Sequence, residues 1–432
     1  MALLAVAQEA PISTETPISV DVVQEVPKPE VRGHIDWQGH PAMHIPWTFF
    51  QKGLTAKTPK MSYRHQFRQV VFEPYLRESG VRIFLVAAIA EEKARNPKQA
   101  RKLILQQIAY INDFVAAHPE HYALAKTPEE AREIIATTDK MVLIHSIEGA
   151  HLLLEHPEDA QFWADQGVAL MTLIHLRDDE LGGAALLPGT LGRLVNPRGA
   201  KHLRRNERRG LTPRGKAAIV ELADAGILVD FSHMTRDSRA DALAVTAENG
   251  IPPLLTHGSL ASIRDTDWAI TEAQLVEVYA QGGIFAMGLS GPKLVPDRPQ
   301  IPIPDHCVGS IDSWAFHYQR ATQVLEAHVG EVFGDPTLTV DSLTEAQRTA
   351  LSVGWSSDWN GFLSHSEPKY GRGRCKPLSE LTDPLPIDTL GLAHPGMLPQ
   401  QWKRLEEAGV DLDPTQRSAE RFLQLWEQVL AR

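Results

Sequence analysis

The segment TPRGKAAIVELADAGILVDFSH, residues 212–233, holds one complete helix–strand unit. Thr212 can cap the amino end of a helix, Pro213 suits the first helical position, and Gly226 is typical of a residue just past a helix end. The run Ile227–Phe231 that follows is almost continuously apolar, as in strands buried on both faces of a parallel sheet. The segment therefore predicts a helix packed on a parallel sheet, with polar residues directly after the strand.

Apolar runs of this kind recur eight times, with helical patterns between them. The runs are Gly33–Gln38, Val81–Ala87, Met141–Ile147, Val168–Ile174, Ile227–Phe231, Pro252–Thr256, Gly283–Gly288 and Leu351–Trp355. Eight alternations of strand and helix predict an α/β fold, a (β/α)₈ barrel of the TIM type. Two doubly wound domains are the weaker alternative, because no Pro/Gly-rich linker divides the repeats.

The chain has 432 residues, more than the roughly 250 of a typical barrel. We expect a flexible arm over residues 1–32, a barrel over 33–393 and a helical tail over 394–432 that packs on the barrel. Insertions at the barrel mouth account for the remaining length, and they are expected near 48–80, 90–139, 176–211 and 290–350.

Charge and composition limit the partners. The chain carries 43 Lys and Arg against 54 Asp and Glu, a net charge of −11. Such a chain lacks the positive field that nucleic acid or an anionic membrane surface demands. No stretch reaches the roughly 20 apolar residues of a membrane span. A small-molecule, peptide-like substrate is expected instead, and a homodimer is compatible with the sequence.

The two cysteines, Cys307 and Cys375, allow one bridge, but two free thiols and a cytoplasmic location are the expectation. The alternative is export, with a signal trimmed near the small residues Ala5-Val6-Ala7.

One stretch departs from the acidic average. Residues 198–216 contain eight basic side chains, namely Arg198, Lys201, Arg204, Arg205, Arg208, Arg209, Arg214 and Lys216. They fit a solvated insertion loop, or a lid that recognises an anionic group of the substrate.

Histidines and carboxylates lie at the carboxyl ends of six of the eight runs. The candidates are His40 after Gln38, Glu148, His175, His233, His257 and Asp358. Barrel active sites are built on this face. Imidazole and carboxylate ligands suit Zn²⁺, with Mn²⁺ or Fe²⁺ as alternatives, so the pattern predicts a site for one or two metal ions. A carboxylate that bridges two cations would leave a hydroxide nucleophile between them.

Five motifs occur in a fixed order along the chain. They are IEGAH (Ile147–His151), MTLIH (Met171–His175), the stretch Gly210–His233, LTH followed by Arg264-Asp265, and SSDWNG (Ser356–Gly361). This set resembles the membrane (renal) dipeptidase family, peptidase family M19, whose members are binuclear zinc barrels of the amidohydrolase superfamily. The resemblance runs over about residues 33–360.

The resemblance implies a role for each matching residue. Glu148 would bridge two metals, and His233 and His257 would complete the shell of one of them. Asp358 would bind the other metal and carry a proton to the leaving amine. His175 would stabilise the oxyanion, and Arg264 would hold the terminal carboxylate of the substrate.

The first strand departs from the family pattern Asp-x-His-x-Asp, in which the His and the second Asp are ligands. One register makes His34 and Asp36 the ligands, and the other makes Gln38 and His40 the ligands. We prefer Gln38 and His40, because they follow the apolar stretch and precede Pro41. Gln38 is a weak neutral ligand, so the site could be mononuclear, or His44 could contribute.

The sequence therefore predicts a zinc-dependent, dipeptidase-like metallohydrolase in which a metal-bound hydroxide attacks the amide carbonyl of a small dipeptide-like substrate. One alternative is an amidohydrolase acting on a non-peptide amide, an N-acyl compound or a lactone. Another is a catalytically degenerate barrel that only binds.

Overall fold

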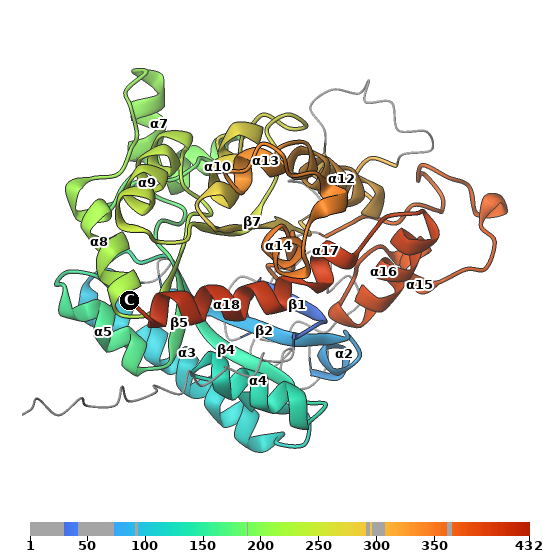
Figure 1. Ribbon diagram of the computed structural model, residues 1–432, viewed down its shortest axis with the longest axis horizontal. Helices are drawn as coiled ribbons and strands as arrows, with labels where there is room; N and C mark the ends of the chain where they lie inside the picture. Colours follow the sequence, from blue (N-terminus) through green and yellow to red (C-terminus); the bar gives the residue numbers. More distant parts are fainter. Residues whose placement is uncertain are drawn as a thin grey trace, which may run out of the picture. The chain divides into compact units, whose positions relative to one another are not determined.

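Parallel strands close into a barrel in the computed structural model, which describes residues 30–41, 73–90, 94–187, 189–290, 294–295, 307–360 and 365–432 (Figure 1). The barrel strands are β1 (His34–Gly39), β2 (Val81–Ala88), β4 (Met141–Glu148), β5 (Val168–Thr172), β6 (Leu228–Asp230), β7 (Leu254–Gly258), β8 (Ile284–Gly288) and β9 (Gly354–Ser356). They pair in the order β2-β1-β9-β8-β7-β6-β5-β4, and pairing of β2 with β4 closes the ring. The predicted (β/α)₈ barrel and its eight strands are confirmed.

One further strand was not predicted. Strand β3 (Tyr122–Leu124) pairs in parallel with β4, with Tyr122 opposite Met141, and extends the sheet beyond the barrel. Its three residues carry too short a pattern to be recognised in the sequence.

Helices surround the barrel and fill the insertions. Their bounds are α2 (Glu73–Arg77), α3 (Pro97–Ala117), α4 (Pro128–Thr137), α5 (Glu158–Asp165), α6 (Gly189–Val195), α7 (Pro197–Arg204), α8 (Pro213–Asp224), α9 (Arg236–Asn249), α10 (Glu272–Ala280), α12 (Ile311–Ala327), α13 (Val329–Val332), α14 (Glu345–Ala350), α15 (Pro386–Leu390), α16 (Leu398–Glu407), α17 (Asp413–Gln416) and α18 (Ser418–Leu430).

Helix α8 shows why the opening segment folds as it does. The Thr212 side chain accepts a hydrogen bond from the Gly215 backbone N–H, and Pro213 occupies the first turn. Gly226 has a φ of +79°, which a side chain would disfavour. The helix therefore begins and ends where the capping residues predict.

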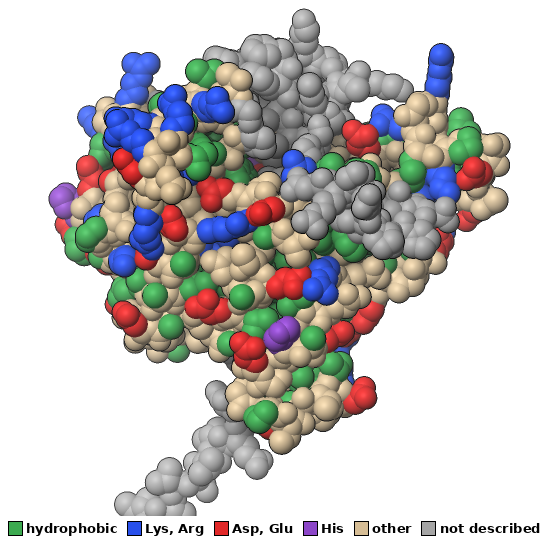
Figure 2. Space-filling view, turned by 90° about the horizontal axis from the view of Figure 1, so that it is seen from above, with side chains coloured by type: hydrophobic (Ala, Val, Ile, Leu, Met, Phe, Trp, Pro, Cys, Tyr) green, Lys and Arg blue, Asp and Glu red, His purple; other side chains and the backbone are tan. Residues whose placement is uncertain are grey.

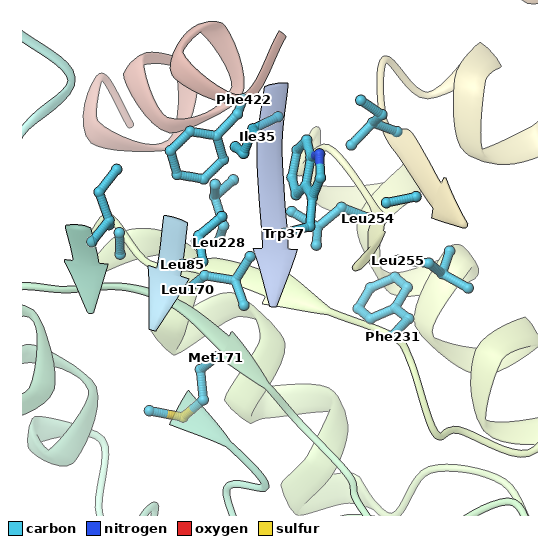
Figure 3. Packing of buried hydrophobic residues seen from close by; sticks show 14 of the residues in the cluster. Ile35, Trp37, Leu85, Leu170, Met171, Leu228, Phe231, Leu254, Leu255 and Phe422 are labelled. Atoms are coloured by element: carbon cyan, nitrogen blue, oxygen red, sulfur yellow. The ribbon is translucent and has the colours of Figure 1, made fainter. Parts of the chain in front are cut away.

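The C-terminal helix α18 covers the end of the barrel at which the strands begin. Figure 1 shows it crossing the barrel, and Figure 3 shows Phe422 beside Ile35 at the start of β1. The Phe422 and Trp37 rings meet edge to face, with centroids 5.3 Å apart. The Glu420 carboxylate of α18 also accepts a hydrogen bond from the Val31 backbone N–H at 2.8 Å. With this end packed by apolar side chains, the opposite end is left for chemistry.

The cysteines correct one prediction. Cys307 and Cys375 form a disulfide, with Cα atoms 5.6 Å apart, and are not free thiols. The two cysteines are 68 positions apart in the sequence, and only the fold brings their segments together, so the sequence did not predict this bond. Among the helices that the structure describes, none combines the length and apolar character needed to cross a bilayer.

Residues 48–72 of the insertion expected near 48–80 lie outside the described residues, and His44 does as well. The one near 176–211 contains α6 and α7. The described part of the one near 290–350 contains α12, α13 and α14.

Candidate metal centre

Glu148, the last residue of β4, lies at the centre of a cluster of buried side chains at the carboxyl ends of the strands. Its Oε1 lies 3.0 Å from Nε2 of His233 and 3.7 Å from Nε2 of His257. Its Oε2 lies 3.0 Å from Nε2 of His40 and 3.5 Å from Nε2 of His175. The two carboxylate oxygens thus face two different sets of imidazole nitrogens.

The first set consists of His233, after β6, and His257, within β7. Their Nε2 atoms lie 2.7 Å apart. His233 has a φ of +64°, an unfavourable backbone conformation for a residue with a side chain. Such strain persists only where the surrounding structure enforces it, and it is concentrated at functional sites.

Asp230 supports this set from inside the barrel. The fully buried carboxylate accepts hydrogen bonds from the backbone N–H groups and hydroxyls of Ser232 and Thr256 and from the hydroxyl of Thr172, at 2.6 to 2.9 Å. The Thr256 hydroxyl also lies 2.9 Å from Nδ1 of His257. Because that hydroxyl donates its proton to Asp230, it accepts from Nδ1, which leaves the Nε2 lone pair of His257 directed at Glu148.

The second set is built around His40, just after β1. Its Nδ1 lies 3.2 Å from the Ala87 carbonyl oxygen, and its Nε2 lies 3.3 Å from Oδ1 of Asp358. Since a carbonyl only accepts, Nδ1 carries a proton and Nε2 faces Glu148 and Asp358. Asp358 is buried and has a φ of +52°, so it also adopts a strained backbone.

The carboxylates of this set favour a positive charge beside them. Burial by itself would lower the pKa of His40, but the facing carboxylates of Glu148 and Asp358 outweigh burial and raise it to about 10. Burial opposes the charge of Glu148, yet His175 and His40 hold the pKa of that carboxyl well below its usual range. A buried carboxylate that remains ionised, as that of Glu148 does, is typical of a site that holds a cation.

Gln38 lies between the two sets. Its Oε1 is 3.0 Å from the Thr256 hydroxyl, and its Nε2 is 3.5 Å from Nε2 of His40. The amide therefore contacts residues of both sets.

The residues of the other register lie elsewhere. His34, at the start of β1, stacks on Trp402 with ring centroids 4.9 Å apart. Asp36 accepts a hydrogen bond from the Ser357 backbone N–H at 2.9 Å and another from its hydroxyl. Burial raises the pKa of Asp36 to about 7. Asp36 thus joins β1 to the segment that carries Asp358.

Two predicted residues have different surroundings. His175 lies 4.5 Å from His233, ring centroid to ring centroid, and belongs to the cluster. Arg264 lies on the loop after β7, where its Nη1 donates to the Val295 carbonyl oxygen at 2.9 Å. Its role in holding a substrate carboxylate stays a prediction.

Sequence reasoning missed three residues that shape this site. Asp230 and Thr256 support His257, and the Trp268 ring lies 4.5 Å from that of His233, with its Nε1 donating to the Leu186 carbonyl oxygen at 3.1 Å. Asp230 offered a signal, because a carboxylate inside an apolar strand is costly unless it has a structural or functional purpose. Trp268 offered none, since its loop position is set by the fold.

The donor set fits one or two metal ions. Two groups, Glu148 with His175 and His233, and Glu148 with His40 and Asp358, each place three ligand atoms within 4.8 Å of one another. Imidazole nitrogens with carboxylate oxygens are typical of Zn²⁺ and related divalent cations. A closed barrel with such donors at the carboxyl ends of its strands defines the class of barrel metallohydrolases.

Comparison with known proteins places the chain within this class. The sequence model described as membrane dipeptidase (peptidase family M19) matches residues 42–305, and the chain belongs to this family. Dipeptidase ataJ of Aspergillus terreus is 25% identical over 189 residues, which are 42% of this chain and 44% of the relative. An uncharacterized dipeptidase of Schizosaccharomyces pombe is 23% identical over 196 residues, 45% of this chain and 43% of the relative. The matched region spans less than half of each of these relatives.

Solved structures share the fold. The dipeptidase AC, a metallopeptidase of family M19, has a TM-score of 0.61 at 14% identity, covering 93% of this chain and 100% of the other. A metallopeptidase of Rhodobacter sphaeroides, liganded with a phosphinate mimic of the dipeptide L-Ala-D-Ala, has a TM-score of 0.59 at 14% identity over the same shares of the two chains.

Proposed function

We propose that the protein is a zinc-dependent dipeptidase that cleaves the amide bond of a small peptide-like substrate at the Glu148 cluster. The observation that carries this proposal is the position of Glu148, whose two oxygens face separate groups of imidazoles at 3.0 Å. A carboxylate in this position suits the bridge between two cations. Bound divalent cations would supply an activated water and polarise the amide carbonyl.

Residues of the chain would transfer the proton, stabilise the oxyanion and bind the cations. Asp358, buried beside His40, would accept the proton released by the attacking water and deliver it to the leaving nitrogen. His175 would donate from its imidazole to the oxyanion that forms on the carbonyl oxygen. His233 and His257 would bind one cation, and Gln38, His40 and Asp358 the other, with Glu148 between them.

The two cations would bind unequally. The Thr256 hydroxyl has one proton, and the Asp230 carboxylate at 2.8 Å is its stronger acceptor. To bind a cation beside His40, the Gln38 amide, whose Oε1 lies 3.0 Å from this hydroxyl, would turn its oxygen toward His40 and donate from its amino group to the hydroxyl. A neutral amide oxygen binds a cation more weakly than the imidazole that the family has there, so the Gln38 side loses its ion first.

The substrate would be a dipeptide or a close analogue. Curated relatives of this chain are named dipeptidases, and one structural neighbour holds a mimic of a dipeptide. Arg264 is the candidate for binding the terminal carboxylate of the substrate, as a guanidinium can do with two hydrogen bonds. For this role it would exchange its contact with the Val295 carbonyl for the substrate.

Purified protein supplied with Zn²⁺ or Mn²⁺ and offered a panel of dipeptides tests the proposal, with Asp358→Asn as the inactive comparison. We expect turnover by the wild type and loss in the variant. Turnover of only non-peptide amides, N-acyl compounds or lactones would establish the alternative amidohydrolase. Less than one metal per chain and no turnover of any substrate would establish a degenerate binding barrel.

The Cys307–Cys375 disulfide bears on the compartment. Structural disulfides are rare in the reducing cytoplasm. We therefore propose export, the alternative to the cytoplasmic location expected from the sequence. Thiol titration of the denatured protein, purified from its native source with free thiols blocked at lysis, should find no free thiol, and two free thiols would contradict export. The homodimer stays a prediction.

A further inference from the structure

The helical insertion after β5, here called the α6–α7 insertion (residues 189–208), differs from the rest of the acidic chain. It contains six Lys and Arg residues and one acidic residue, Glu207. Figure 1 shows α7 standing away from the barrel, and Figure 2 shows Lys and Arg side chains gathered on this part of the surface. The insertion is therefore a local basic surface on a protein of net charge −11.

The basic side chains of its outer part point to solvent. The exposed ones are Arg193, Arg198, Lys201, Arg204 and Arg205. Arg205 pairs with Glu207 at 3.6 Å, whereas the described part of the chain offers no ion-pair partner to Arg193, Arg198, Lys201 or Arg204. These charges are thus available to an external anion.

The inner basic residues act differently. Arg209, directly after the insertion, is buried and binds Asp178 at 2.7 Å and Asp267 at 3.2 Å. Arg208 pairs with Asp241 at 2.7 Å. These pairs fix the base of the insertion to the barrel, so its outer surface is presented on a rigid support.

Two leucines accompany the exposed charges. Leu194 is 74% exposed and Leu203 is 62% exposed, the highest fractions of any large hydrophobic side chain in the described residues. Exposed leucines are ordinary when scattered, but a pair within a short basic hairpin is the composition of an interfacial membrane-binding element. A purely polar partner such as nucleic acid would leave the leucines without a role.

We propose that the α6–α7 insertion is a docking surface for an anionic phospholipid bilayer, with the basic side chains on the headgroups and the two leucines in the interface. The net charge of the whole chain argues against such binding, but charges more than a Debye length of about 8 Å away are largely screened at physiological salt. The local charge of the insertion, and not the net charge of the chain, therefore determines whether this surface binds an anionic bilayer.

Vesicle sedimentation tests this proposal on the full chain. We expect the protein to sediment with phosphatidylcholine vesicles that contain phosphatidylglycerol, and not with phosphatidylcholine alone, and we expect salt to release it. Each basic side chain near such a surface contributes about fivefold in partitioning, so Arg198→Gln/Lys201→Gln/Arg204→Gln should weaken binding by about a hundredfold. Leu194→Ser/Leu203→Ser should weaken it as well.

Two controls make the result specific. Arg95→Gln/Lys98→Gln/Lys102→Gln removes three exposed charges from the region of α3, and Leu378→Ser/Leu390→Ser removes leucines that are 58% and 54% exposed elsewhere. Both controls should bind like the wild type, and melting curves should confirm that every variant folds. No sedimentation of the wild type, or equal losses in the α3 control, would overturn the proposal. If the leucine variant bound vesicles as fully as the wild type, and the wild type bound duplex DNA equally well, the insertion would be a general polyanion-binding surface and the bilayer proposal would be wrong.

Discussion

The two sides of Glu148 are built differently, although both present imidazoles to the same carboxylate at 3.0 Å. On one side stand His233 and His257, the ligands that the resemblance to the family predicts, and Asp230 and Thr256 hold the imidazole of His257 through hydrogen bonds. On the other side, Gln38 and His40 are the ligands that the preferred register of the first strand predicts, and a backbone carbonyl, that of Ala87, orients His40.

This difference bears on how tightly each side of the proposed site would hold a cation. The Asp230 network lies inside the barrel and ties β5, β6 and β7 together, so a substitution there would leave buried polar groups without partners. The first strand meets the site through its last residues alone, so its ligands can be replaced at lower cost. We therefore expect one tightly bound cation and one weakly bound cation.

The largest effect is expected from Glu148→Gln, which affects both sides at once. Loss of the bridging charge should reduce bound metal to well below one ion per chain and remove activity, by about a thousandfold or more. Elemental analysis after gel filtration, with dipeptide turnover, measures both. If the variant kept both ions, Glu148 would not be the element shared by the two sides.

Asp358→Asn should reduce kcat by about 10²- to 10⁴-fold, the range of a lost general acid–base group. Because Asp358 belongs only to the His40 side, the ion at His233 and His257 should remain. Metal content of about one per chain with little turnover would fit this assignment, whereas unchanged turnover would contradict it.

Asp230→Asn should weaken the cation at His257 by about 10- to 100-fold, as expected for a partner that orients a ligand. The Gln38 side should be affected less. Titration with a competing chelator measures the affinity of each ion, and Ser232→Ala, which removes one hydroxyl donor to Asp230, provides a milder matched change. An equal loss of affinity for both cations would show that the Asp230 network supports both sets of ligands and not only the set of His233 and His257.

Gln38→His should tighten the weaker ion by about tenfold, in proportion to the gain of one imidazole ligand, and leave the tighter ion unchanged. The comparison with Gln38→Ala, in which the weaker ion should be lost first on dialysis, separates ligation from packing. Tight binding of two ions by the wild type would remove the asymmetry on which this prediction depends.

Much of the architecture could be predicted from local patterns. Eight apolar runs and the capping signals around Pro213 were enough for the barrel, because strands buried on both faces need continuous apolar sequence and helices need caps. The place of Glu148, His175, His233 and His257 followed from the same pattern, since parallel strands of a closed barrel end on one rim.

What the sequence determined by itself was therefore the order of elements, the rim on which the polar residues lie, and the family. The tertiary structure decided what depends on residues distant in the chain. It brought His40 rather than His34 to Glu148, joined Cys307 to Cys375, and placed Asp230 and Thr256 behind His257. It also exposed Leu194 and Leu203 beside a basic run. These features rest on distances and exposure, which a one-dimensional pattern does not carry.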